Sequence, residues 1–81
     1  MRTRDEVIEV LVKQGAKRDR AAIYADCYLE YQTATANIAE YGVVVKHPRT
    51  GNPIENPYLG IRDRAEKKLS RMQNINTTGL W

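Results

Sequence analysis

Apolar residues recur every three or four positions in three stretches of this chain, which is the spacing of one face of a helix. In residues 1–16 the repeat consists of Val7, Ile8, Leu11 and Val12. Thr3, with Glu6 three residues later, has the pattern of a capping box, and Gly15 provides a stop. The pattern predicts a short N-terminal helix of about ten residues.

The second stretch, residues 19–42, contains a long apolar stripe that is rich in tyrosine. The stripe consists of Tyr24, Cys27, Tyr28, Tyr31, Ala34, Ile38 and Tyr41. We expect Asp19 to cap this helix and Gly42 to end it, because glycine adopts a left-handed conformation without steric cost. A helix of this length extends ~35 Å at 1.5 Å per residue. One short helix cannot cover it, so either the last helix or a neighbouring subunit must lie along the stripe.

A short β-hairpin is predicted to follow, over residues 43–55. Three β-branched residues, Val43–Val45, favour a strand, and the polar run 48–52 is typical of a turn. Residues 53–55 form the return strand, which must be an edge strand because Pro53 has no N–H to donate. A two-stranded hairpin is not stable by itself. It is therefore expected to lean on the helices or to pair with another chain.

A third helix is predicted over residues 56–73, with Asn56 as its cap and Pro57 in its first position. Its apolar line consists of Tyr58, Ile61, Ala65, Leu69 and Met72. Residues 74–81 form a polar, weakly patterned tail, in which Trp81 is either a docked anchor or part of a flexible end. The predicted fold class is mostly α with a small β-hairpin, in the order helix, long helix, β-hairpin, helix, within one small domain (1–81).

So short a chain needs extra stabilisation, because a domain of its size buries only roughly 60% of its unfolded surface. Cys27 is the only cysteine, which excludes a disulfide within one chain, and we expect it to be a small buried hydrophobe. One cysteine and His47, the only histidine, cannot fill a tetrahedral zinc site. We therefore predict a homo-oligomer without metal or cofactor. The candidate oligomer-interface residues are Tyr24, Tyr28, Tyr31, Ile38 and Tyr41.

The net charge of +3 is unevenly distributed along the chain. Residues 1–20 have six basic and four acidic side chains, residues 21–42 have three acidic and no basic ones, and residues 43–71 have seven basic and three acidic ones. Basic ends suit phosphate or an acidic partner, although an ordinary solvated surface looks much the same. The candidate DNA-binding residues are Lys46, Arg49, Arg62, Arg64, Lys67, Lys68 and Arg71.

No catalytic arrangement is visible, and we predict that the chain is not an enzyme. A glycine-rich phosphate loop, paired carboxylates and a Ser/His/Asp order are all missing. The hairpin tip around His47 is either a groove-probing finger or a solvated turn. A small HNH-type nuclease fragment acting through His47 is a weaker alternative, because no further metal ligands stand at suitable spacing. No signal peptide and no run of ~18 apolar residues is present, so no membrane association is expected.

The order of these motifs resembles the small terminase subunit family of tailed bacteriophages. The motifs are, in chain order, Asp19-Arg20-Ala21-Ala22, Tyr24, Cys27-Tyr28, Tyr31, Gly42-Val43-Val44-Val45, Gly51-Asn52-Pro53, Asn56-Pro57-Tyr58-Leu59-Gly60-Ile61-Arg62 and Leu69-Ser70-Arg71-Met72. The resemblance covers residues ~17 to 72, most of the chain. Each motif alone is common, but their order and spacing together are not.

The resemblance implies a mostly helical fold with a β-hairpin and subunits that assemble into rings. It implies a role in recognising double-stranded viral DNA and passing it to the terminase large subunit, the ATPase and nuclease, in the cytoplasm of a bacterial host. Tyr24, Tyr28, Tyr31 and Ile38 would then line the helical core or the subunit contact. The alternative from the residues alone is a non-catalytic helical oligomerisation module that binds no nucleic acid.

Overall fold

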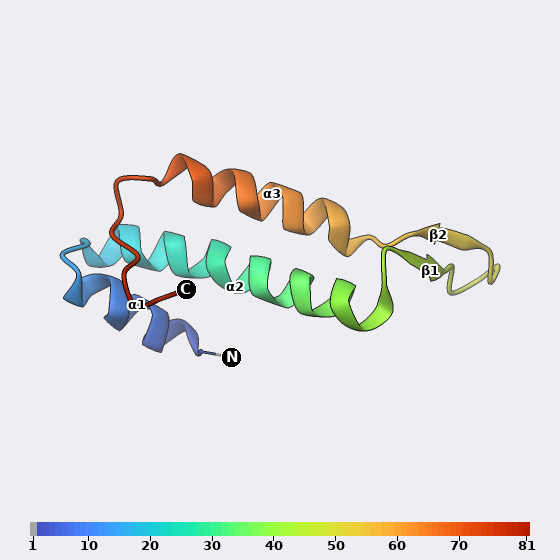
Figure 1. Ribbon diagram of the computed structural model, residues 1–81, viewed down its shortest axis with the longest axis horizontal. Helices are drawn as coiled ribbons and strands as arrows, with labels where there is room; N and C mark the ends of the chain where they lie inside the picture. The colour runs from blue at the N-terminus through green and yellow to red at the C-terminus, as the bar shows by residue number, and fades with distance from the viewer. Residues whose placement is uncertain (1) are drawn as a thin grey trace.

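Three helices and a two-stranded antiparallel hairpin make up the structure, a computed structural model that describes residues 2–81. The elements are α1 (Arg4–Lys13), α2 (Arg18–Tyr41), β1 (Val44–Lys46), β2 (Pro53–Glu55) and α3 (Tyr58–Arg71). Figure 1 shows α3 returning alongside α2, α1 packed against the first half of α2, and the hairpin projecting beyond both long helices. The molecule is elongated, 49 × 22 × 17 Å. The predicted fold class is confirmed.

The first helix starts as its sequence predicts. The Glu6 N–H donates to the Thr3 hydroxyl at 3.2 Å, and the Thr3 N–H donates to the Glu6 carboxylate at 3.4 Å, which completes the capping box. Val7, Ile8 and Leu11 are buried in the core against α2.

The second helix begins one residue earlier than predicted, and Asp19 does not cap it. Lys17 occupies the cap position with an extended backbone and makes no capping hydrogen bond through its side chain. Asp19 already lies in the first turn, where its carboxylate accepts the N–H of Arg20 at 2.9 Å. The end of the helix is as predicted: Gly42 has φ +87°, a conformation that strains residues with a Cβ.

The hairpin pairs Val45 with Ile54 and places Pro53 opposite Lys46. The first strand starts at Val44, one residue later than predicted. The Val43 carbonyl accepts the Asn56 N–H at 2.8 Å, next to the last pair of the ladder. Val45 and Ile54 are half-buried, while the flanking strand residues are exposed.

Asn56 joins the end of α2, the hairpin and the start of α3. Its side-chain NH₂ donates to the Asn37 side-chain oxygen at 3.0 Å and to the Gly42 carbonyl at 2.8 Å. Its side-chain oxygen accepts the Tyr58 N–H at 3.0 Å, which is the predicted capping contact. Pro57 already has helical dihedral angles, so the assigned start at Tyr58 and the predicted start differ only at the margin.

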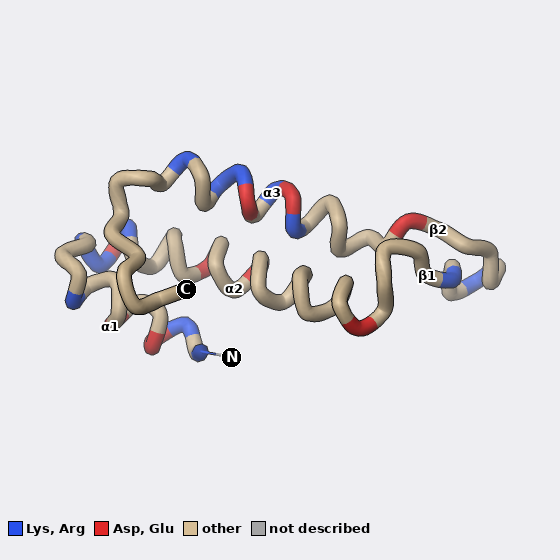
Figure 2. The backbone as a smooth tube through the Cα atoms, in the orientation of Figure 1, with Lys and Arg blue, Asp and Glu red and all other residues tan. Residues whose placement is uncertain are grey.

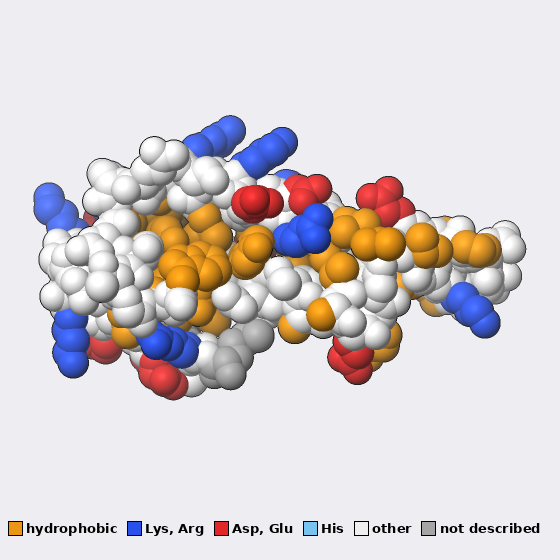
Figure 3. All heavy atoms as spheres, in the orientation of Figure 1, with side chains coloured by type: hydrophobic (Ala, Val, Ile, Leu, Met, Phe, Trp, Pro, Cys, Tyr) orange, Lys and Arg blue, Asp and Glu red, His pale blue; other side chains and the backbone are white. Residues whose placement is uncertain are grey.

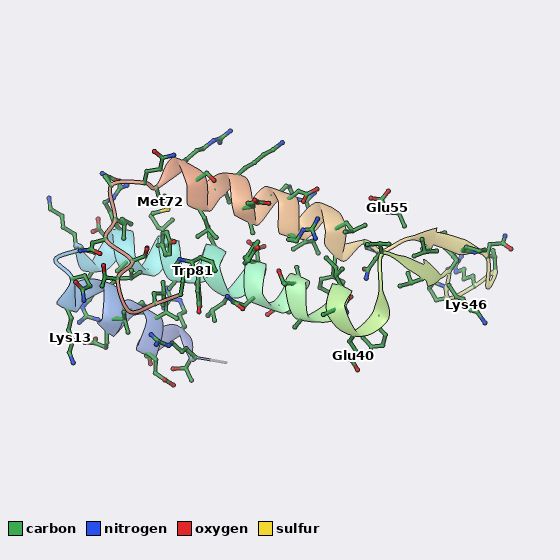
Figure 4. The ribbon with its side chains drawn as sticks, viewed as in Figure 1. Lys13, Glu40, Lys46, Glu55, Met72 and Trp81 are labelled. Atoms are coloured by element: carbon green, nitrogen blue, oxygen red, sulfur yellow. The ribbon has the colours of Figure 1, made fainter. Side chains whose placement is uncertain are left out.

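The tail is docked rather than loose. Ile75 and Leu80 are buried in the same core as α1 and the first half of α2, which its polar sequence does not predict. The Trp81 indole N–H donates to the Tyr24 hydroxyl at 3.2 Å. The Trp81 and Tyr28 rings pack edge to face, with their centroids 4.7 Å apart. Figure 4 shows Trp81 beside α2, close to the middle of the molecule.

The chain therefore covers much of the tyrosine stripe itself. Tyr24 and Tyr28 are buried, so of the two roles considered for them, core or subunit contact, they occupy the core. Tyr31 and Ile38 are half-buried. Tyr41, at the far end of α2, is 61% exposed, because α3 and the tail do not reach over it. Among residues 2–81, no helix is long and apolar enough to cross a membrane.

Candidate nucleic-acid interface

Four of the seven predicted DNA-binding residues share one face of α3. Lys67, Lys68 and Arg71 lie three, four and seven residues after Arg64, so a helix places the four side chains on one side. All four side chains are exposed, and none is in an ion pair within the described part of the chain. Figure 2 shows Lys and Arg spread along α3 toward its C-terminal end. The face therefore presents four cations to solvent.

Arg62 does not belong to this face. It projects from another side of α3, where its guanidinium lies 3.3 Å from the Asp63 carboxylate and is partly shielded. Glu66 lies on that same side, from the helical spacing. Asp63 lies four residues before Lys67, so the helix places it at the edge of the face formed by Arg64, Lys67, Lys68 and Arg71, whereas Glu66 lies on the side of Arg62.

Lys68 also faces the neighbouring helix. Burial raises the pKa of the Cys27 thiol on α2, and the nearby Lys68 ammonium partly opposes this shift. Cys27 is buried, as predicted. Its thiol therefore stays protonated at neutral pH and acts as an apolar side chain beside the basic face.

The hairpin tip lies at the other end of the molecule. Figure 4 shows Lys46 on the projecting hairpin, far from Lys13 at the opposite end. Lys46 and Arg49 therefore cannot form one continuous surface with the C-terminal turn of α3 within a single chain. The structure divides the predicted DNA-binding residues into two separate groups.

His47 organises the hairpin turn instead of facing a substrate. Its ring Nδ1 accepts the N–H groups of Arg49 at 3.1 Å and Thr50 at 3.4 Å. Its backbone N–H donates to the Asn52 carbonyl at 2.8 Å. Across residues 2–81, no three His, Cys, Asp or Glu side chains gather in a way that would hold a metal ion. These contacts favour the structural interpretation of His47 over the nuclease alternative.

An exposed apolar patch surrounds the base of the hairpin. Tyr41, Val43 and Val44 are 61%, 56% and 59% exposed, respectively. Figure 3 shows hydrophobic side chains continuing from the helices onto the hairpin. Of these residues, Tyr41 is a predicted interface residue, whereas Val43 and Val44 belong to the predicted hairpin, which is expected to lean on the helices or to pair with another chain.

Sequence reasoning missed two cations at the corner between α1 and α2. Lys17 and Arg20 line a hollow with residues of the tail, and the Arg20 guanidinium donates to the Asn74 side-chain oxygen at 3.3 Å. The basic count of residues 1–20 was the only available signal. Arg20 and Asn74 are 54 positions apart in the sequence, so no local pattern predicts their contact.

The chain was compared with protein families, curated proteins and solved structures. Residues 3–75 match a family model described as phage terminase, small subunit. No curated protein and no solved structure matches the chain. The matched region includes all three helices and the hairpin.

Proposed function

Because the chain belongs to the phage terminase small subunit family, we propose that it binds viral DNA and directs it to the large ATPase–nuclease subunit for packaging. The predicted family is confirmed, and so is the prediction of a non-catalytic protein in phage DNA packaging. The family implies a packaging complex with the large subunit and DNA, and the bacterial host cytoplasm is where we propose that this chain acts.

The basic face of α3 is the observation that carries the DNA-binding proposal. Arg64, Lys67, Lys68 and Arg71 are exposed and lie on one side of one helix, while Asp63 at the edge of this face is paired with Arg62. Cations with this arrangement neutralise backbone phosphates and release counterions, which gives affinity that depends on salt and little on base sequence. In contrast, residues 21–41 of α2 contain three acidic and no basic side chains, which makes this part of the helix a poor track for DNA.

The test is the salt dependence of duplex binding, measured by fluorescence anisotropy with a long labelled duplex. The double variant Lys67→Ala/Arg71→Ala removes two cations from the centre and end of the face. If each cation neutralises one phosphate, the slope of log affinity against log salt becomes shallower by about 1.8. The affinity at low salt falls accordingly.

The matched control is Arg4→Ala/Lys13→Ala, which removes the same charge from α1. Both residues lie on α1, where Arg4 pairs with Asp26 at 2.7 Å, and the control therefore leaves the basic face of α3 unchanged. A control that weakens binding as much as the α3 variant would show that net charge, and not this face, sets the affinity. A wild-type chain that leaves duplex DNA free at low salt would favour the interaction module without nucleic-acid binding.

Assembly is the second part of the proposal. We propose that copies of the chain associate through the hairpin base, where Tyr41, Val43 and Val44 remain exposed. A hairpin of two short strands is marginal alone, and contact with a neighbouring copy would stabilise it. The ring expected for the family would follow from repetition of that contact.

A further inference from the structure

A polar hollow opens where the α1–α2 corner meets the tail. Its volume is about 350 Å³. Ala16 and Ile75 contribute apolar floor, and Ile75 is itself part of the core. The polar lining comes from Gln14, Lys17, Arg20, Asn74 and Asn76. None of the residues that line the hollow is acidic.

The lining is rich in hydrogen-bond donors. The Asn74 side-chain oxygen is occupied by the Arg20 guanidinium at 3.3 Å. The Asn76 side-chain oxygen accepts both the N–H and the hydroxyl of Thr78, at 2.9 and 2.7 Å. Each asparagine therefore keeps its NH₂ group for another partner. Together with the Lys17 ammonium and the remaining Arg20 N–H groups, these donors suit a ligand that is anionic and rich in acceptor oxygens.

The hollow lies at the same end of the molecule as the last turn of α3. Figure 1 shows the α1–α2 corner and the C-terminal end of α3 together, opposite the hairpin. Figure 2 shows basic residues at both places. Asn74 follows Arg71 closely in the chain and contacts Arg20, so the tail connects the basic face to the hollow.

We propose that this hollow holds a backbone phosphate of duplex DNA and continues the DNA track beyond the basic face of α3. This inference rests on the proposed DNA-binding function and adds Lys17, Arg20, Asn74 and Asn76 to its contact residues. The ligand is a phosphate group because two cations and two amide NH₂ groups, with no carboxylate among the lining residues, match its charge and its several acceptor oxygens. The hairpin end then remains free for other contacts.

Duplex binding by the full chain tests the proposal through Lys17→Ala/Arg20→Ala. The matched control, Lys13→Ala/Arg18→Ala, removes the same charge from the same corner without touching the lining. We expect the lining variant to bind at least about tenfold more weakly at moderate salt, with a slope shallower by up to about 1.8, and the control to change far less. Equal losses in the two variants would overturn the proposal.

A third variant keeps the fold and reverses the chemistry. Asn74→Asp retains an oxygen for Arg20 but replaces the NH₂ donor with a second anionic oxygen. It is expected to weaken DNA binding about tenfold, as one lost phosphate contact with added repulsion would. Unchanged binding by a folded Asn74→Asp protein would count against the hollow.

Inorganic phosphate separates this proposal from the function on which it rests. Side-chain amide signals of Asn74 and Asn76 in ¹⁵N NMR spectra should shift saturably with phosphate in the wild type and stay fixed in Lys17→Ala/Arg20→Ala. If phosphate shifts these signals but the wild type does not bind duplex DNA, the hollow is a phosphate site and the proposed DNA-binding function is wrong. If the wild type binds DNA while phosphate leaves these signals unmoved and the lining variants bind normally, the hollow fails and the α3 face stands.

Discussion

At the residue scale, Asn56 is the buried polar side chain on which the junction of three elements depends. It is 2% exposed, and both its NH₂ group and its oxygen have partners, at 2.8–3.0 Å. A buried amide with every group paired favours one geometry, and its removal leaves its partly buried partners without these hydrogen bonds. Asn56 thus fixes the angle between the hairpin and the long helices.

Replacing Asn56 with alanine should lower the free energy of unfolding by about 2–3 kcal/mol, because the Gly42 carbonyl loses its donor and the Tyr58 N–H loses its cap. Urea denaturation at fixed protein concentration measures the change. The control Asn37→Ala removes only the partner at 3.0 Å and should cost about 1 kcal/mol. An equal decrease in the free energy of unfolding for the two variants would show that Asn56 contributes no more than its contact with Asn37.

Cys27 gives a prediction about pH. Burial raises the pKa of its thiol, so the folded chain holds the proton more tightly than the unfolded chain does. Above about pH 8.5 the unfolded state loses this proton first, and the free energy of unfolding decreases as pH rises. Below that pH the thiol is protonated in both states, and its contribution to the free energy of unfolding is fully present. Urea denaturation from about pH 7 to 9.5 should therefore show a larger loss in the wild type than in Cys27→Ala, in which the other titrations are unchanged. Parallel curves would contradict this.

At the element scale, local chemistry predicts most of what the structure contains. The capping box of α1, the glycine stop after α2 and the Asn56-Pro57 start of α3 each act within a few residues, so they can be seen in the sequence. The start of α2 could not be placed from Asp19, because Lys17 takes the cap position without any side-chain signal. Helix starts without a side-chain cap are set by tertiary packing.

The tail and the hollow could not be predicted for a related reason. Ile75 and Leu80 are isolated apolar residues in a polar segment, and only their contact with a distant core buries them. The hollow requires Arg20 to meet Asn74, an arrangement that no periodicity encodes. The basic face of α3 was predictable from spacing, but the pairing of Arg62 with Asp63 was not, because it depends on the conformations of the two side chains. A contact of Arg62 with DNA stays a prediction.

At the scale of the whole molecule, Tyr24 and Tyr28 are buried within the chain. We therefore expect copies of the chain to contact one another at another surface. The remaining exposed apolar surface is concentrated at the hairpin base, with Ile23 and Trp81 as separate exposed positions. An elongated molecule with such a patch at one end can associate laterally while its other end stays free.

Sedimentation at micromolar concentration should therefore show an oligomer whose dissociation concentration rises about tenfold in Val43→Thr/Val44→Thr, because polar hydroxyls replace buried methyl groups. These threonines keep the β-branched shape of the strand. Ile23→Thr, at a similarly exposed position on α2, is the control and should leave the oligomer unchanged. A monomeric wild type would end the assembly proposal.

The separation of the hairpin from the α1–α2 corner has a consequence for any closed assembly. If the protomers stand side by side in one direction, all hairpins gather on one rim and all corner hollows on the opposite rim. The two openings of such a ring would then differ in chemistry: one would be apolar and formed by the hairpins, and the other would be cationic. A polyanion arriving from solution would meet one opening in preference to the other, and the assembly would have an intrinsic sense of direction before any motor engages it.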